Sequence, residues 1–225
     1  MQVGAPIKEA SLPVPERFHE APVTAHLPPA PQFGAPIPLA PAPEVLNFLA
    51  TRRSTSALTL TAPAPDAGEI DALLRLATRV PDHGKLTPWR FVVLEGEAKA
   101  RFAAKLEALA IARGDQTAAA KLGKLKVPPL AIAVIAAPKP AAIPQWEQLL
   151  SAGAVATTLL YATLALGYGA NWITDWYAYD EDAKAILGLT GEEQVAGFML
   201  IGTPREPAQE RERPAVAPLV SRWEG

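Results

Sequence analysis

The sequence contains no cysteine among its 225 residues, which excludes disulfide frameworks, cysteine zinc sites and thiol catalysis. Histidine is scarce, with only His19, His26 and His83. Two of the three fall in a proline-rich segment, so a histidine metal site is not expected. The sequence also lacks a Gly-x-Gly-x-x-Gly turn, a Walker A loop and a Gly-x-Ser-x-Gly elbow. If the protein performs chemistry, a bound organic cofactor is the expected source of its reactivity.

An excess of charge of one sign is also missing. Lys and Arg number 21 and Asp and Glu 23, for a net charge of −2, which gives no electrostatic case for nucleic acid or an anionic membrane surface as partner. The N-terminus lacks the basic stretch and apolar run of a secretory signal, and we expect a cytoplasmic protein. Residues 148–174 carry no charge, but this stretch is Ala-rich and contains Gly167 and Gly169. It therefore favours a buried helix followed by a strand over a membrane span.

Proline is abundant but unevenly placed, with 11 of its 24 copies in residues 1–43. Because proline removes a backbone donor and fixes φ, this segment is not expected to form a helix or a central strand. Two interpretations remain open: a disordered or extended tail, or an arm that wraps a partner subunit. The apolar residues that such an arm would use are Phe18, Leu27, Phe33, Ile37 and Leu39. The predicted organisation is an N-terminal extension at 1–43, one domain at 44–207 and a C-terminal tail at 208–225.

Hydrophobic periodicity after Pro43 predicts alternating helices and strands, which indicates a layered fold that mixes both. The clearest helix is predicted at 66–79, where Asp66 and Glu69 form a plausible N-terminal cap pair. Gly114 and Gly167 are expected to end two later helices. The other predicted helices span 44–51, 97–113, 146–166 and 180–187, and the predicted strands span 91–94, 130–136, 171–174 and 195–201.

Arg52, Arg53 and Ser54 follow the first predicted helix. Two guanidinium groups and a hydroxyl supply the charge-assisted donors that a phosphate needs. The same residues also suit a structural role, because arginines at a helix C-terminus complement the helix dipole.

A second candidate lies in the loop 79–91, between an amphipathic helix and a buried strand, where functional sites often collect. Trp89 and Phe91 are expected to fill the core. Arg79, His83 and Lys85 instead indicate function. Three cationic or near-cationic groups in one loop repel one another unless an anion lies nearby.

Together these motifs resemble the FMN-dependent nitroreductase family over residues 43–207, and most of all its compact bacterial NAD(P)H nitroreductases. The motifs are Arg52-Arg53-Ser54, Pro81-Asp82-His83, Pro88-Trp89-Arg90-Phe91, Gly197-Phe198 and Gly202-Thr203-Pro204. The resemblance implies an α+β fold with a mixed, largely antiparallel sheet flanked by helices. It also implies a homodimer, with the long Ala-rich helix at its interface and one FMN in each of two sites between the subunits.

The resemblance assigns cofactor contacts to positions of this sequence. Arg52, Arg53 and Ser54 would hold the phosphate and ribityl side, and Arg79 and His83 would contact the flavin. Trp172, Ile173 and Thr174 match a strand that passes the flavin, and Arg205 matches a basic position after the last strand. Lys85 joins the set as a cation that can stabilise the reduced, anionic flavin. No catalytic acid is assigned, because flavin N5 carries the hydride.

The sequence departs from the usual pattern of the family at several positions. Lys85 stands where Asn is usual and Thr87 where Gln is usual, and Ala57 and Leu58 follow where many relatives have a further Arg. The expected function is reduction of electron-poor acceptors, such as nitroaromatics or quinones, with NADH or NADPH as co-substrate. The changed loop motivates an alternative, a flavin-binding carrier or redox sensor without efficient turnover. A third hypothesis is an interaction protein whose proline-rich arm is the functional part.

Overall fold

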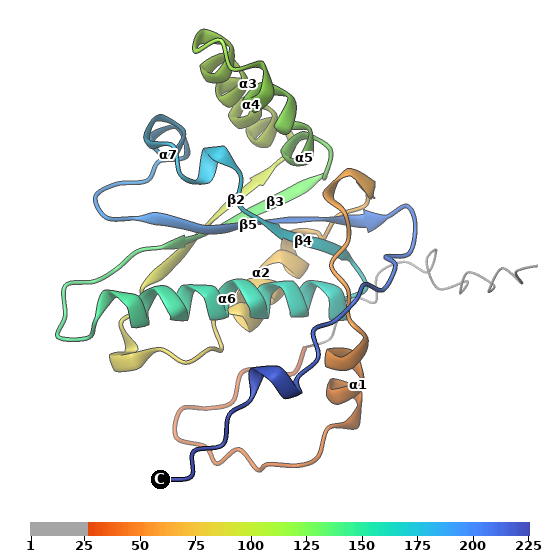
Figure 1. Cartoon of the computed structure of the whole chain (residues 1–225), viewed down its shortest axis with the longest axis vertical. Coiled ribbons are helices and arrows are strands. Elements are labelled where there is room, and N and C mark those ends of the chain that lie inside the picture. The colour runs from red at the N-terminus through yellow and green to blue at the C-terminus, as the bar shows by residue number, and fades with distance from the viewer. Residues whose placement is uncertain (1–26) are drawn as a thin grey trace, which may run out of the picture.

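The computed structural model describes residues 27–225, so Phe18, His19 and His26 lie outside the described part of the chain. Helices and strands alternate along it (Figure 1). The helices are α1 (Pro43–Thr51), α2 (Ala67–Ala77), α3 (Gly96–Ala112), α4 (Gln116–Lys121), α5 (Gly123–Lys126), α6 (Gln145–Ala165) and α7 (Glu181–Leu187). The strands are β1 (Leu60–Thr61), β2 (Trp89–Glu95), β3 (Leu130–Ala136), β4 (Gly169–Ile173) and β5 (Gln194–Pro204). Short 3-10 turns lie at Ala57–Thr59, His83–Lys85, Trp176–Ala178 and Ala217–Leu219.

The strands form one sheet in the order β1-β5-β3-β2, and β4 also pairs with β5. Every pairing within residues 27–225 is antiparallel. The central strand β3 is buried along its whole length, because it is apolar throughout and helices cover both of its faces. The antiparallel sheet flanked by helices confirms the predicted α+β fold, and β3 matches its predicted bounds.

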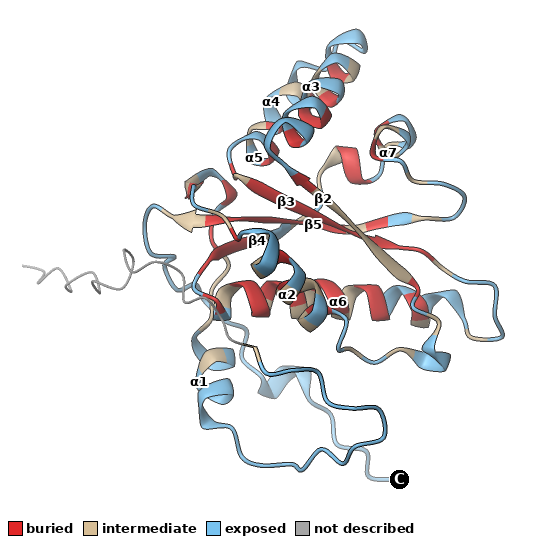
Figure 2. Ribbon diagram, turned by 180° about the vertical axis from the view of Figure 1, so that it is seen from behind, coloured by how far each residue is buried: buried red, intermediate tan, exposed pale blue. Residues whose placement is uncertain are grey.

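Two layers of helices cover the sheet, and β5 contributes alternate residues to each. Phe198 packs with Leu106 of α3 and Leu187 of α7 on one face. Its neighbour Met199 packs with Leu159 of α6 on the other face, which α2 also covers. Buried segments in Figure 2 therefore concentrate in the sheet and on the sheet-facing sides of the helices.

Helix ends follow the chemistry predicted from the sequence. The Asp66 carboxylate accepts from the backbone N–H of Glu69 (2.8 Å), and the Glu69 carboxylate accepts from that of Asp66 (3.0 Å). Gly114 and Gly167 follow α3 and α6 with φ of +73° and +88°, the left-handed geometry that glycine adopts without steric cost. These local signals therefore predicted the start of α2 and the ends of α3 and α6 correctly.

The prediction missed α4, α5 and β1. The two helices have only 6 and 4 residues, too short for periodicity to distinguish a helix from a loop. The two residues of β1 pair with β5 at Thr203 and Pro204, a contact between distant parts of the chain that no local pattern encodes. The same pairing extends β5 to Pro204, beyond its predicted end at residue 201.

Residues 27–42 and 205–225 extend from the body below α6, in the orientation of Figure 1. The former contains no helix or strand, the latter a single 3-10 turn, and almost all of their side chains are exposed (Figure 2). The Arg75 guanidinium holds the first segment through two bonds to the carbonyl oxygen of Pro28 (3.0 and 3.1 Å). Large apolar side chains, including Leu39 and Trp223, make little contact with their own chain.

Among the described helices, α6 alone is long and apolar enough to cross a membrane. Its inner side is buried against α2 and the sheet, which is the packing of a core helix. Its outer face, defined here as Trp146, Leu149, Leu150, Gly153, Ala154 and Thr157, is exposed or half-exposed. α1 buries none of its residues and also exposes Val45, Leu46 and Leu49. A single chain therefore leaves two adjoining apolar surfaces uncovered, since Phe48 of α1 contacts Tyr161 of α6.

Candidate functional site

Arg52 and Ser54 form the first group of candidate residues, in the extended chain that follows α1. One terminal guanidinium nitrogen of Arg52 donates to Ser54 Oγ (3.3 Å), and the guanidinium carbon lies 5.5 Å from the centre of the Tyr161 ring. The Nε–H of Arg52 is buried and has no hydrogen-bond partner within the described residues. Since buried donors in proteins are nearly always satisfied, this N–H is available to a ligand.

Arg53 and Arg205 are placed differently. The Nε–H of Arg53 donates to the carbonyl oxygen of Gln209 (2.8 Å), and the guanidinium lies 3.9 Å from the Glu210 carboxylate. Arg53 thus holds the start of the C-terminal tail beside the Arg52–Ser54 group. Arg205 has an exposed side chain, while its backbone N–H bonds to Thr59.

The end of β4 carries the predicted residues Trp172, Ile173 and Thr174. The indole N–H of Trp172 donates to the carbonyl oxygen of Ala196 (3.2 Å), and its ring lies over β5. Ile173 points to the opposite face of the sheet and packs against the core beneath α3 and α7. Thr174 Oγ1 accepts from the Tyr179 hydroxyl (2.7 Å). Trp172 and Thr174 therefore keep exposed surface beside β4, whereas the Ile173 side chain belongs to the core.

The backbone of β4 also connects to the first group. Thr55 donates its N–H to the carbonyl oxygen of Ala170 (2.9 Å), and the Asn171 amide donates to the carbonyl oxygen of Thr55 (2.5 Å). These bonds place Ser54 beside the start of β4 although 116 residues separate Thr55 from Asn171. Arg52 and Ser54 thus lie near the start of the strand that carries Trp172.

The loop that begins at Pro81 is held against α6 by hydrogen bonds and by packing. Ser151 Oγ donates to the carbonyl oxygen of Pro81 (2.8 Å), and the Asp82 carboxylate accepts from the backbone N–H of Leu86 (3.1 Å) and Thr87 (2.8 Å). Gly84 lies so close to Ile143 that a Cβ at this position would overlap the isoleucine side chain. The loop therefore has one well-defined shape, set by hydrogen bonds at one end and close packing at its centre.

That shape is strained at the two positions where the sequence departs from the family pattern. Lys85 and Thr87 have φ of +54° and +49°, in the left-handed region, which costs about 1–2 kcal/mol for a residue with a side chain. Asn, usual at the position of Lys85 in the resembling family, tolerates this region better. Strain of this kind persists only where surrounding contacts impose it, and it is commonest at functional sites.

His83 stands at the centre of this loop and pairs with a residue that the sequence analysis overlooked. Its Nδ1 lies 2.7 Å from Glu147 Oε2 in the first turn of α6, and Arg79 and Lys85 are exposed nearby in sequence. The crowding of cations led us to expect an anion, and Glu147 supplies one from within the chain. The available signal was its position, the last charged residue before the uncharged stretch 148–174.

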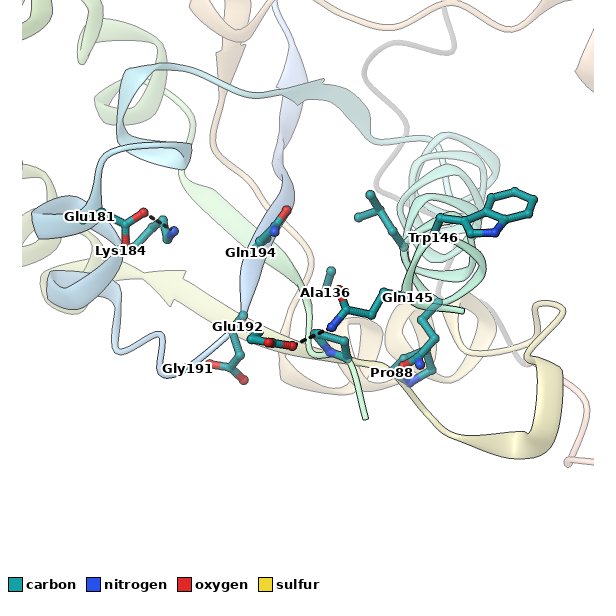
Figure 3. Close-up of a pocket in the computed structure, with 13 residues that line it drawn as sticks. Pro88, Ala136, Gln145, Trp146, Glu181, Lys184, Gly191, Glu192 and Gln194 are labelled. Carbon is teal, nitrogen blue, oxygen red and sulfur yellow. Dashed lines mark hydrogen bonds and ion pairs between the residues drawn. The ribbon is translucent and has the colours of Figure 1, made fainter. Parts of the chain in front are cut away.

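A cavity of about 540 Å³ opens at the same end of α6, between its first turns, the ends of β3 and β5, and α7 (Figure 3). The carboxylates on its wall are already paired. Gln145 Nε2 donates to Glu192 (2.6 Å), Lys184 bonds to Glu181 (2.7 Å), and Arg90 makes a two-point contact with Glu193 (2.6 and 2.8 Å). None of the predicted cofactor residues lines this cavity.

The two groups of candidate residues therefore lie toward opposite ends of α6. Arg52 contacts Tyr161, whereas His83 contacts Glu147, and these helix positions are about 21 Å apart at 1.5 Å per residue. One chain alone does not bring Arg52 and Ser54 together with Arg79, His83 and Lys85.

Comparison with known proteins identifies the family of this chain. The model of the family described as "Nitroreductase family" matches residues 49–203. The Escherichia coli K12 protein named "Putative NAD(P)H nitroreductase YdjA" is 33% identical over 165 residues, covering 72% of this chain and 89% of the relative. The Haemophilus influenzae protein named "Putative NAD(P)H nitroreductase" is 34% identical over 170 residues, covering 74% of this chain and 91% of the relative.

Solved structures show the same fold. A nitroreductase-like protein from Bacillus cereus aligns with a TM-score of 0.70 at 20% identity, covering 84% of this chain and all of that one. A nitroreductase with bound FMN from Bacteroides fragilis aligns with a TM-score of 0.61 at 21% identity, covering 80% and 99%. The family match, the relatives and the fold agree, and the chain belongs to the nitroreductase family.

Proposed function

We propose that this protein is an FMN-dependent oxidoreductase that takes hydride from NADH or NADPH and reduces electron-poor acceptors such as nitroaromatics or quinones. The observation that carries the proposal is the spare donor of Arg52. Its buried Nε–H, without a partner in the described residues, lies in a group that also offers Ser54 Oγ. A phosphate monoester is the ligand that such a charge-assisted donor set suits.

The candidate residues differ in how well they are placed to bind FMN. Arg52 and Ser54 would hold the phosphate. Arg53 would contribute only the nitrogens that Gln209 leaves free, and Trp172 and Thr174 would line the ring side. When bound, the flavin supplies hydride transfer, and the protein supplies position and charge. The cations Lys85 and Arg79 would favour the anionic form of the reduced ring.

We infer a homodimer in which each site combines the two groups described above. A two-fold axis that passes α6 at Ala154, midway between Glu147 and Tyr161, would place the His83 end of one subunit beside the Arg52 end of its partner. The outer face of α6 carries small residues at its centre, Gly153, Ala154 and Thr157, which would allow a partner helix to approach closely. The uncovered apolar surface of α1 adjoins it through the contact of Phe48 with Tyr161. The same proposal takes residues 44–207 as the flavin domain and 1–43 and 208–225 as extensions of a cytoplasmic protein.

The absorbance spectrum of freshly purified protein tests the cofactor. We expect a flavin band in near-equal ratio to the chain, or its appearance on titration with FMN. Arg52→Ala should weaken FMN binding by about tenfold to a hundredfold, since it removes hydrogen bonds to a charged group. The exposed Arg101→Ala should leave binding unchanged. A protein that takes up no FMN contradicts the proposal.

Anaerobic mixing of the flavin-loaded protein with NADH or NADPH tests the reaction. Bleaching of the flavin band, followed by its return when a quinone or nitroaromatic is added, is the expected result. Protein that binds FMN and photoreduces normally, yet reacts with neither pyridine nucleotide, would favour the carrier or sensor hypothesis that the changed loop at Lys85 and Thr87 motivates.

A further inference from the structure

The contact between His83 and Glu147 joins two elements that are 64 residues apart in sequence. The Nδ1 to Oε2 distance of 2.7 Å is that of a charge-assisted hydrogen bond. A carboxylate has no proton to give at neutral pH, so the ring must donate through Nδ1–H. Nε2 is then the nitrogen left for other partners, because the hydrogen bond at one ring nitrogen decides the role of the other.

The backbone on either side of His83 is anchored, while its side chain is 68% exposed and so open to other partners. Ser151 of α6 and Ile143, two residues before α6 begins, contact the loop on either side of His83. The other nearby carboxylate, Asp82, is occupied by the backbone N–H groups of Leu86 and Thr87, and Lys85 carries a positive charge. Glu147 is therefore the carboxylate that accepts the hydrogen bond from His83.

We propose that Glu147 is a positioning residue that holds His83 in the Nδ1–H form and thereby makes Nε2 of His83 a proton donor to the bound acceptor. The second part of this proposal rests on the proposed function, whereas the first part does not. Reduction of a quinone by two electrons adds one hydride and one proton. NAD(P)H supplies the hydride through the cofactor, and the His83 imidazolium gives its Nε2 proton to the quinone oxygen.

The step balances within the site. The imidazolium becomes a neutral imidazole with its proton on Nδ1, still bonded to Glu147, and water returns a proton to Nε2 before the next turnover. Glu147 accepts the Nδ1–H of His83 before and after the transfer, so it acts through His83 and not on the substrate. A general acid of this kind typically contributes about 10²- to 10⁴-fold to a rate.

Nitrogen NMR of the full chain, labelled with ¹⁵N in its histidine rings, tests the positioning. The chain has only three histidines, and His83→Gln identifies the signal of His83. At a pH where this ring is neutral, we expect the proton on Nδ1 in the unmodified protein and on Nε2 in Glu147→Ala, since free imidazole side chains in water prefer Nε2–H. Glu192→Gln, which changes another carboxylate bonded to the first turn of α6, should leave the signal unchanged. A proton on Nε2 in the unmodified protein overturns the proposal.

Steady-state reduction of a quinone tests the proton donor. We expect Glu147→Gln to lower kcat about tenfold, with the quinone KM and the FMN content unchanged, and to have no further effect in a His83→Gln background. Equal effects of Glu147→Gln with and without His83 would overturn the role of Glu147 in proton donation. A protein that binds no FMN would defeat the proposed function and with it the donor role, while the NMR result still decides the positioning.

Discussion

The indole of Trp172 fills the space above Gly197 in which any other residue would place its Cβ. Trp172 lies on β4 and Gly197 on β5, and the indole N–H bonds to Ala196, the residue before the glycine. The absence of a side chain at Gly197 therefore lets a large aromatic ring lie on the sheet.

Gly197→Ala should push the indole off β5 and break its hydrogen bond. We expect the free energy of unfolding to fall by about 1–3 kcal/mol, the usual cost of overpacking, measured by urea denaturation. In a Trp172→Ala background the same change should cost little, because the overlapping ring is gone. An equal cost in both backgrounds would locate the effect elsewhere.

Gly153→Leu tests the proposed dimer. No atom lies within 4 Å of the place where a Cβ on Gly153 would sit, so the single chain accommodates the larger residue, and leucine also favours a helix. A partner helix packed against this position would not. We expect sedimentation or light scattering to show monomers with an unchanged circular dichroism spectrum. Ala104→Leu, on the exposed side of α3, is the control that should remain dimeric. A dimeric Gly153→Leu protein contradicts the proposed interface.

Glu193→Gln tests the ion pair that joins β2 to the start of β5. The Arg90 guanidinium lowers the pKa of Glu193 to about 2, helped by the backbone N–H of Thr190. A carboxyl whose pKa is depressed on folding stabilises the protein fully above its ordinary pKa, 4.5, and loses this effect as the pH falls toward 2. At pH 7 the substitution should lower the free energy of unfolding by about 1–3 kcal/mol.

The difference from the unmodified protein should shrink when the same urea titration is repeated at pH 3.5. Glu206→Gln, an exposed change, serves as control and should have no effect at either pH. A difference for Glu193→Gln that is the same at both pH values would show that the charge of Glu193 is not what stabilises the fold.

Removing the hydroxyl group should have different effects on stability at two buried tyrosines, Tyr177 and Tyr168. The Tyr177 hydroxyl has no partner within the described residues, and burial raises the pKa of Tyr177. The Tyr168 hydroxyl donates to Glu69 (2.7 Å). Tyr177→Phe should leave the thermal midpoint unchanged or raise it, because it removes an unsatisfied buried group. Tyr168→Phe should lower the free energy of unfolding by about 1–2 kcal/mol. A loss of stability in Tyr177→Phe would reveal a partner for its hydroxyl.

Much of this fold could be predicted locally. The cap pair of Asp66 and Glu69, the glycines that end α3 and α6, and the apolar run of β3 each carry their structure in adjacent residues. The prediction failed where structure depends on distant pairing or on elements too short to show a period, as for β1 and α4.

The residues of the candidate site also divide into those that local motifs reveal and those that only distant contacts reveal. Arg52, Ser54 and His83 were found because they stand in recognisable motifs. Glu147 and Tyr161 stand in none, and only the packing of α6 brings them to His83 and Arg52. The same packing assigns Ile173 to the core and Arg53 to the C-terminal tail, a distinction that neighbouring residues in one motif cannot reveal.

If the proposed dimer forms, the separation of the two candidate groups along α6 means that complementary defects can cancel in a mixed dimer. At an FMN concentration that saturates the unmodified protein but not the Arg52→Ala variant, Arg52→Ala chains and His83→Ala chains should each show little activity alone. Refolded together in equal amounts, half of the dimers would be mixed, and each of these would contain one site built from two unaltered halves and one built from two altered halves. About one quarter of the activity of the unmodified protein should therefore return, whereas a site contained within one chain would recover none.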